Sequence, residues 1–174
     1  GEFVIPCDSE FIIESKSFKL YLNSFNQTRF NNIDEVRTTI IKDLSRAAKA
    51  DIGVQIFPLR GAVIPNYLAG VVQPDAVLLD DLDVVVDTYH PAPELLAIEV
   101  GKVEETLVSH LFKTNCPVTG QPDWASVFIY YKGNKMLHES LLRYLISFRE
   151  HQDLHEHCVE RIFCDLQRMC KPES

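Results

Sequence analysis

Four stretches of the chain carry apolar residues at helical spacing, and they fall into two pairs. The first pair covers residues 14–25 and 32–48, and the second covers residues 137–148 and 153–169. The period is clearest in the stretch 32–48, where the apolar residues share one stripe of a helix. These residues are Ile33, Val36, Ile40, Ile41 and Leu44. The pattern predicts two pairs of amphipathic helices.

The two predicted pairs resemble each other in sequence. The stretches 14–25 and 137–148 align without a gap, at a constant shift. Their identical positions are Ser17/Ser140, Tyr21/Tyr144, Leu22/Leu145, Ser24/Ser147 and Phe25/Phe148. The second helix of each pair carries an Asp-Leu pair, at Asp43 and at Asp165, offset by one residue. Similar helices in the same order predict an internal duplication, and chance similarity between amphipathic helices is the alternative.

Between the helix pairs the pattern changes to that of strands. Short segments rich in β-branched and aromatic residues are separated by turns that contain Pro, Gly and Asp. They cover residues 52–57, 81–89, 95–100, 106–112 and 126–133. Within 81–89, the apolar residues Leu82, Val84 and Val86 alternate with residues that are mostly acidic, which predicts a half-exposed strand. Gly133-Asn134 predicts the turn of a hairpin over 127–137.

Strand segments followed by helix pairs predict an α+β protein with an antiparallel sheet. The stretch 88–93 predicts a boundary, so that residues 1–90 form a first module and residues 91–174 a second. The first module begins almost at once with its helices, and the second ends with its helices. We therefore expect strands to be missing at both ends, as in a fragment of a longer chain.

Charge and composition reduce the number of functions that the chain could have. The chain has 174 residues, 46% of them hydrophobic, which is enough to bury a core. The net charge of -8 argues against a surface that binds nucleic acid. We expect no membrane span, because no run of about 18 apolar residues occurs. We expect no signal peptide, because the start, GEFVIPCDSE, has neither a basic region nor an apolar one. None of the five cysteines pairs at zinc-finger spacing, so a reducing, cytoplasmic compartment is expected.

Cys116 is the cysteine whose neighbours suit covalent chemistry. It lies between Asn115 and Pro117 in a turn-like sequence, and Asp123 follows shortly afterwards. A thiolate can attack an electrophilic carbon, and a carboxylic acid can supply the proton that the product needs. The alternatives are a buried, inert cysteine for Cys116 and an ordinary turn residue for Asp123.

Two further clusters could bind ligands. The first surrounds a predicted helix start, where His151 and His155 have a spacing that can bind a metal; its alternative is a solvated helix start. Its members are His151, His155, Glu156 and His157. The second cluster precedes the first helix, where Ser15 could cap the helix and Lys16 could assist a phosphate at its N-terminus.

Three segments together resemble one enzyme family. Residues 14–25, ESKSFKLYLNSF, resemble the signature of the QueF family, the NADPH-dependent 7-cyano-7-deazaguanine reductases of queuosine biosynthesis. Residues 115–124, NCPVTGQPDW, are similar to its catalytic segment. Residues 140–163 resemble its substrate-binding helix pair. The segments occur in the order of the two-module branch, with the signature in the first module and the nucleophile in the second.

The resemblance implies a fold and a chemistry. The fold is two tandem T-fold (tunnelling fold) modules, each an antiparallel sheet with paired helices on one face, usually in a homodimer. By resemblance, Cys116 attacks the nitrile carbon to form a thioimide, and Asp123 supplies the proton. NADPH is the cofactor, and no metal is implied. His155 and Glu156 would recognise the purine-like base.

The resemblance also assigns roles to the cluster that precedes the first helix. Glu14, with the flanking backbone from Ile13 to Ser15, would bind the base from the other module. Ser15 and Lys16 would contact NADPH. The family continues beyond the second helix pair into strands with an Arg-Gly cofactor contact, whereas this sequence stops at Ser174.

Three alternatives to nitrile reduction remain at this point. One is a zinc-dependent T-fold hydrolase of the GTP cyclohydrolase type, with His110, Cys116 and Cys158 as ligands. A second is a module that binds a purine without catalysis. A third is a cysteine hydrolase with His155 as the base.

Overall fold

The computed structural model describes residues 1–57 and 76–173, and it shows an α+β chain, as the sequence predicts. The chain divides into two compact units, Gly1–Val71 and Val72–Ser174. The division comes before the predicted boundary at residue 90, because aliphatic side chains ahead of that residue pack against the core of the second unit. They are Leu79, Leu82, Val84 and Val86.

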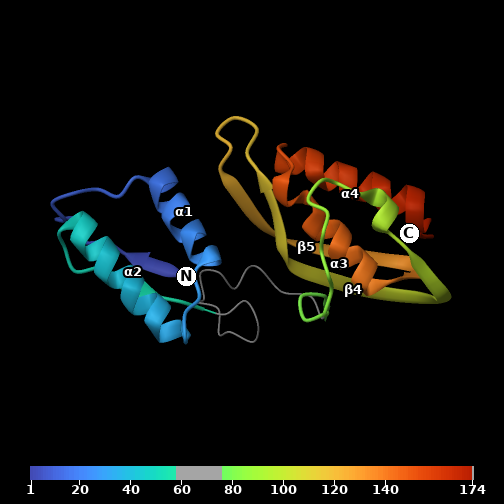
Figure 1. Cartoon of the computed structure of the whole chain (residues 1–174), viewed down its shortest axis with the longest axis horizontal. Helices are drawn as coiled ribbons and strands as arrows, with labels where there is room; N and C mark the ends of the chain where they lie inside the picture. Colours follow the sequence, from blue (N-terminus) through green and yellow to red (C-terminus); the bar gives the residue numbers. More distant parts are fainter. Residues whose placement is uncertain (58–75, 174) are drawn as a thin grey trace. The chain divides into compact units, whose positions relative to one another are not determined.

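The first unit contains two helices and a short antiparallel sheet (Figure 1). Its elements are β1 (Glu2–Val4), α1 (Ser15–Ser24), the 3-10 turn η1 (Phe25–Gln27), α2 (Ile33–Ala48) and β2 (Gly53–Gln55). Phe3 of β1 lies opposite Val54 of β2. The core consists of Ile40, Leu44 and Ala48 from α2 with Ile52 and Val54, while α1 contributes only partly buried side chains.

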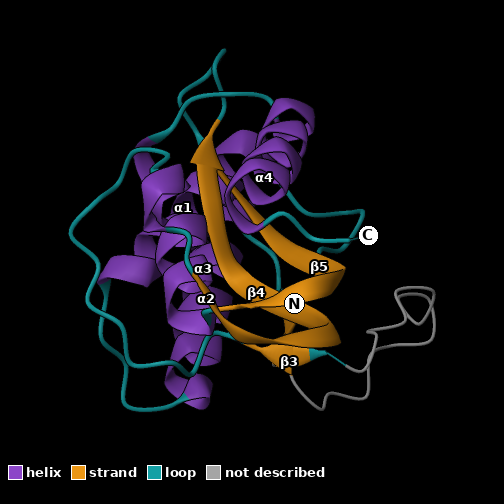
Figure 2. Ribbon diagram, turned by 90° about the vertical axis from the view of Figure 1, so that its right-hand side faces the viewer, coloured by secondary structure: helices purple, strands orange, loops and turns teal. Residues whose placement is uncertain are grey.

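The second unit is built on two long strands (Figure 2). Its elements are β3 (Val77–Leu78), η3 (Pro93–Leu95), β4 (Ile98–Asn115), β5 (Pro122–Met136), α3 (His138–Ile146), η4 (Ser147–Glu150) and α4 (His155–Cys170). The sheet order is β3-β4-β5, with β4 and β5 antiparallel and β3 parallel to β4. Leu107, Phe112 and Tyr131 of the sheet share one core with buried side chains of α3 and α4.

Two predicted strand features are wrong. Residues 81–89 form no strand in the described chain, although their side chains alternate between half-buried and exposed. Gly133-Asn134 is not a turn, because β5 runs through it and Gly133 pairs with Val103 of β4. Glycine is needed there for another reason: its φ is 153°, and a Cβ would lie 2.9 Å from Cα of Pro172.

The two helix pairs repeat one hydrogen bond, which is partly buried in the first unit and buried in the second. In the first unit the Tyr21 hydroxyl donates to Asp43 Oδ2 at 2.9 Å. In the second unit the Tyr144 hydroxyl donates to Asp165 Oδ2 at 2.8 Å. The tyrosines occupy matching positions of the sequence repeat, and the aspartates are offset by one residue. The Asp-Leu pairs thus mark the same hydrogen bond between the two helices of each pair.

Candidate active site

Cys116 lies in the tight turn that joins β4 to β5. Its backbone N–H donates to Gln121 O at 2.8 Å, and the N–H of Gly120 donates to Cys116 O at 2.8 Å. Gly120 has a φ of 67°, in the region that favours glycine. The prediction that Cys116 lies in a turn is confirmed, and the turn leaves its side chain partly exposed.

The turn makes the Cys116 thiol more acidic than an ordinary cysteine. A hydrogen bond from the Thr119 hydroxyl lowers the pKa of Cys116 most, followed by the backbone N–H groups of Thr119 and Val118. Burial and the negative charge of Asp123 oppose this shift. By contrast, burial raises the pKa of Cys158 to about 11. Cys116 is therefore the better nucleophile of the two, since the thiolate is the reactive form.

Asp123 stands beside this turn, on the helix-covered face of the sheet. It pairs with Thr114 across β4 and β5, so the two side chains leave the sheet on the same side. Thr114 is fully buried, and Phe112, on the same face, packs against Phe148 of η4 with ring centroids 5.3 Å apart. Cys116 directly follows Asn115, which pairs with Pro122, so the strand register places Cys116 and Asp123 at the same end of the hairpin.

The segment before α4 is fastened to the end of β4, next to Cys116. The N–H of Asn115 donates to His151 O at 2.8 Å, and the N–H of Asp153 donates to Asn115 O at 3.2 Å. Asn115 also forms a parallel bridge with Gln152. These bonds set the start of α4 beside the thiol-bearing turn.

Asp153 organises this segment, although it was not among the residues predicted from the sequence. Its Oδ1 is 2.9 Å from His157 Nδ1 and accepts from Leu154 N at 2.8 Å. The bond with His157, and next the Leu154 N–H, lower the pKa of Asp153, and the same carboxylate raises the pKa of His157. The signal in the sequence is an Asp at a helix start, four residues before a His.

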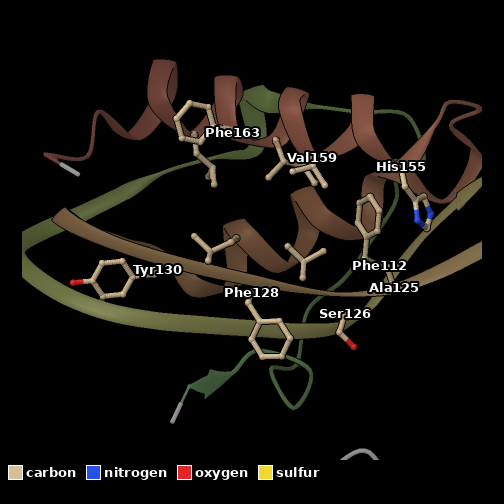
Figure 3. A pocket seen from close by; sticks show the side chains of 12 residues that line it. Phe112, Ala125, Ser126, Phe128, Tyr130, His155, Val159 and Phe163 are labelled. Atoms are coloured by element: carbon tan, nitrogen blue, oxygen red, sulfur yellow. The ribbon is translucent and has the colours of Figure 1, made fainter. Parts of the chain in front are cut away.

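His155, the first residue of α4, lies at one end of an apolar pocket (Figure 3). The pocket has a volume of 320 Å³ and runs between β5 and α4. Its wall includes Phe112, Phe128, Val159 and Phe163. Within the described residues, His155 Nε2 is buried without a hydrogen-bond partner, so it is a polar atom available to a ligand. Glu156 is exposed in the first turn of α4.

In the first unit, Glu14 rather than Ser15 caps α1. The Glu14 carboxylate accepts from the N–H of Lys16 at 2.8 Å, and from the N–H and hydroxyl of Ser17 at 2.7 and 3.0 Å. The Ser15 hydroxyl donates to the same carboxylate at 3.4 Å. These bonds, with Lys16 N–H the largest cause, lower the pKa of Glu14. The predicted Ser15 cap is therefore wrong, because the longer Glu14 side chain reaches these donors first.

The cap bears on the expected NADPH contact at this end of the chain. A phosphate at the N-terminus of α1 would meet the Glu14 carboxylate, which already occupies the amides of Lys16 and Ser17. The exposed ammonium of Lys16 still fits a phosphate at some distance from these amides. The Lys16 ammonium, rather than the helix end, is thus the group here that fits a phosphate.

Two of the three expected zinc ligands, His110 and Cys158, have other surroundings. His110 Nδ1 lies 2.7 Å from Ser126 Oγ, and Cys158 is buried in the core of the second unit. The rings of His151 and His155 pack against Phe148 and Phe112, respectively. Among residues 1–57 and 76–173, no group of three or more His, Cys, Asp or Glu side chains is placed to hold a metal ion.

These features define an α+β chain with an acidified thiol and a carboxylate at one hairpin turn. Residues 1–56 match the family profile described as "Nitrile reductase, 7-cyano-7-deazaguanine-reductase N-term". Residues 122–174 match the profile described as "QueF-like protein". The chain belongs to the QueF family. None of the described helices is long and apolar enough to cross a membrane.

Curated proteins named NADPH-dependent 7-cyano-7-deazaguanine reductase are similar along almost the whole chain. The protein from Bordetella avium (strain 197N) is 55% identical over 177 residues, which cover 100% of this chain and 63% of that protein. Those from Dechloromonas aromatica (strain RCB) and Azoarcus sp. (strain BH72) are 53% and 51% identical, each over 99% of this chain and 60% of the relative. The chain therefore spans about 60% of the length of the curated relatives it matches.

Proposed function

We propose that the chain carries the nucleophilic site of an NADPH-dependent reductase, which converts the nitrile of 7-cyano-7-deazaguanine to an aminomethyl group in queuosine biosynthesis. The observation that carries this proposal is the Cys116 turn. There, donors from Thr119 and Val118 favour the thiolate, and Asp123 lies within electrostatic reach. The names of the relatives supply the substrate and the cofactor.

In the proposed reaction, Cys116 and Asp123 have separate roles. The Cys116 thiolate forms a C–S bond to the nitrile carbon while Asp123 gives a proton to the nitrile nitrogen, and the product is a thioimide. A nitrile accepts hydride poorly, and the thioimide accepts it better. NADPH, when bound, supplies hydride for the two reductions. Breakage of the C–S bond after the first reduction returns the Cys116 thiolate and leaves an imine. The second reduction adds hydride to the imine carbon, and a proton taken up by the nitrogen from solvent completes the amine.

Other residues would bind the two ligands. We assign His155 and Glu156 to recognition of the deazapurine, because His155 presents a buried, unpartnered nitrogen beside the pocket. Glu14, with the backbone of Ile13 and Ser15, is assigned to the amino-pyrimidinone edge, which presents donors to an ionised carboxylate. Lys16 and Ser15 are assigned to NADPH.

The architecture of the whole protein is part of the proposal. The repeated Tyr–Asp bond between the helices of each pair supports two related T-fold modules in tandem. We further propose a homodimer that binds no nucleic acid. A cytoplasmic location would suit the chemistry, since Cys116 must stay a reduced thiol to attack a nitrile.

Intact-mass spectrometry tests the proposal. Mixing the chain with 7-cyano-7-deazaguanine should add the mass of one nitrile molecule, and Cys116→Ala should abolish the addition. Cys164→Ala, which removes another exposed thiol, is the matched control and should keep it. An unmodified wild-type chain at saturating nitrile would contradict the proposal.

A further inference from the structure

The hairpin that carries Cys116 gathers two cations on the face away from Asp123. Lys113 and Trp124 lie opposite each other in the register of β4 and β5, so their side chains leave the sheet on the same side. Asp123 and Trp124 are neighbours on a strand and point to opposite faces. The Arg149 guanidinium lies over the Trp124 ring, 5.9 Å from its centroid.

Lys113 and Arg149 are held close together although both are positively charged. Lys113 Nζ donates to Arg149 O at 2.8 Å, and Asn115 Nδ2 donates to the same carbonyl at 3.3 Å. Burial and the charge of Arg149 lower the pKa of Lys113, while Glu150 opposes this with a smaller effect. In the described part of the chain, no ion pair with a carboxylate neutralises either cation, and the buried Nε of Arg149 has no hydrogen-bond partner.

An oxyanion bound between the two cations would reduce the repulsion between them. Two like charges that are partly removed from water are unfavourable unless an opposite charge joins them. A guanidinium suits a phosphate because its N–H groups form a planar fork, and an ammonium adds a point charge. The Trp124 side chain is 42% exposed, which leaves aromatic surface beside the cations. In a chain with a net charge of -8, this pair is not part of a generally basic surface.

We propose that Lys113, Arg149 and Trp124 form a binding site for a nucleotide, with its phosphate on the two cations and its base against the indole ring. The site is separate from the thiol chemistry, since it lies on the opposite face of the hairpin from Asp123. It therefore does not depend on the proposed reaction.

Tryptophan fluorescence gives a direct test, because Trp124 is the only tryptophan in the chain. Titration with adenosine monophosphate should change the emission with saturation. Adenosine, which lacks the phosphate, should bind about tenfold more weakly or worse. Inorganic phosphate should also bind more weakly than the nucleotide. Equal affinity for adenosine would overturn the role of the cations, and equal affinity for inorganic phosphate would overturn the role of the indole ring.

Variants separate this site from general surface charge. Arg149→Gln and Lys113→Gln should each weaken adenosine monophosphate binding about tenfold, and Arg149→Lys should weaken it less. Lys132→Gln, which removes a lysine of β5 that pairs with Glu104, is the control and should bind as the wild type does. Circular dichroism checks that each variant is folded. Wild-type affinity in both glutamine variants, or no saturable change in the wild type, would overturn the proposal.

Discussion

The two helix pairs have matching sequences and a matching Tyr–Asp bond, yet they are buried to different extents. None of the residues of α1 is buried, whereas most of α3 is. Phe25 is partly buried after α1, and its counterpart Phe148 is completely buried after α3. The strands account for this difference, because β1 and β2 have 3 residues each while β4 and β5 have 18 and 15.

The local sequence thus determines that each helix pair forms, and the length of the sheet strands determines how deeply the pair is buried. In the second unit, the same long strands that cover the helices also end in the turn that carries Cys116. The core around Phe112 and Phe148 thus supports the site directly, since it fixes the end of β4. Residues 1–57, the described part of the first unit, contain the helix pair without such a hairpin.

The largest expected effect is the loss of stability when the matching phenylalanines are truncated. Phe148→Ala should lower the free energy of unfolding of the second unit by about 3–5 kcal/mol, because it opens a cavity in a closed core. Phe25→Ala should cost the first unit less than half of that, because Phe25 is only partly buried. Urea unfolding followed by Trp124 fluorescence reports the second unit, and circular dichroism reports both. Equal losses of stability in the two variants would contradict the claim that the two helix pairs are buried to different extents.

Asp123→Asn should produce the largest chemical effect. Loss of the general acid should slow formation of the Cys116 adduct by about 100-fold or more. Removal of the negative charge should at the same time speed alkylation of Cys116 by iodoacetamide at neutral pH, because the charge of Asp123 opposes thiolate formation. Time-resolved mass spectrometry measures both rates, with Asp51→Asn of the first unit as control. If both rates moved in the same direction, the role of Asp123 as proton donor would be wrong.

Removal of the repeated hydroxyl should have an intermediate effect. Tyr144→Phe leaves the buried Asp165 short of one donor, and we expect a loss of about 2 kcal/mol. Tyr21→Phe should cost less than about 1 kcal/mol, because water can reach the partly buried Asp43. Denaturation curves of the two variants test this, and a larger loss for Tyr21→Phe would contradict the burial difference.

The smallest expected effect concerns the pH dependence of the thiol. Thr119→Val removes the hydroxyl that contributes most to the lowered pKa of Cys116, so the pKa should rise. The alkylation rate of Cys116 should then reach its midpoint at a higher pH, while Cys7 of the first unit keeps its profile. Peptide mapping after alkylation across a pH series measures both. An unchanged midpoint for Cys116 would show that the turn does not acidify the thiol.

The helix pairs could be predicted from the sequence because their period and caps are local. The predicted stretches 14–25 and 153–169 agree with α1 and α4 to within two residues or fewer at each end. The long strands were harder to predict, because Gly133 suggests a turn unless the close approach of Pro172 is known. The Asp123–Thr114 pairing likewise depends on strand register, which the sequence does not contain locally.

Not every residue of the candidate site could be predicted from the sequence around it. Cys116 and Asp123 could be singled out as a thiol and a carboxylate in one loop. Asn115 could not, because its role depends on backbone bonds to residues 151–153, which are distant in the sequence. Asp153 could have been found, because it stands at a helix start four residues before His157. The Glu14 cap could have been predicted, since Lys16 and Ser17 lie at capping distance from it.

The most direct test of the account is the position of the nitrile adduct. After mixing with one equivalent of 7-cyano-7-deazaguanine, the chain is digested and each cysteine peptide is weighed. We expect the added mass on Cys116 alone, and on neither of the exposed thiols Cys7 and Cys164. An unmodified Cys116, or equal modification of Cys7 and Cys164, would contradict the claim that the hairpin turn of the second unit performs the covalent step.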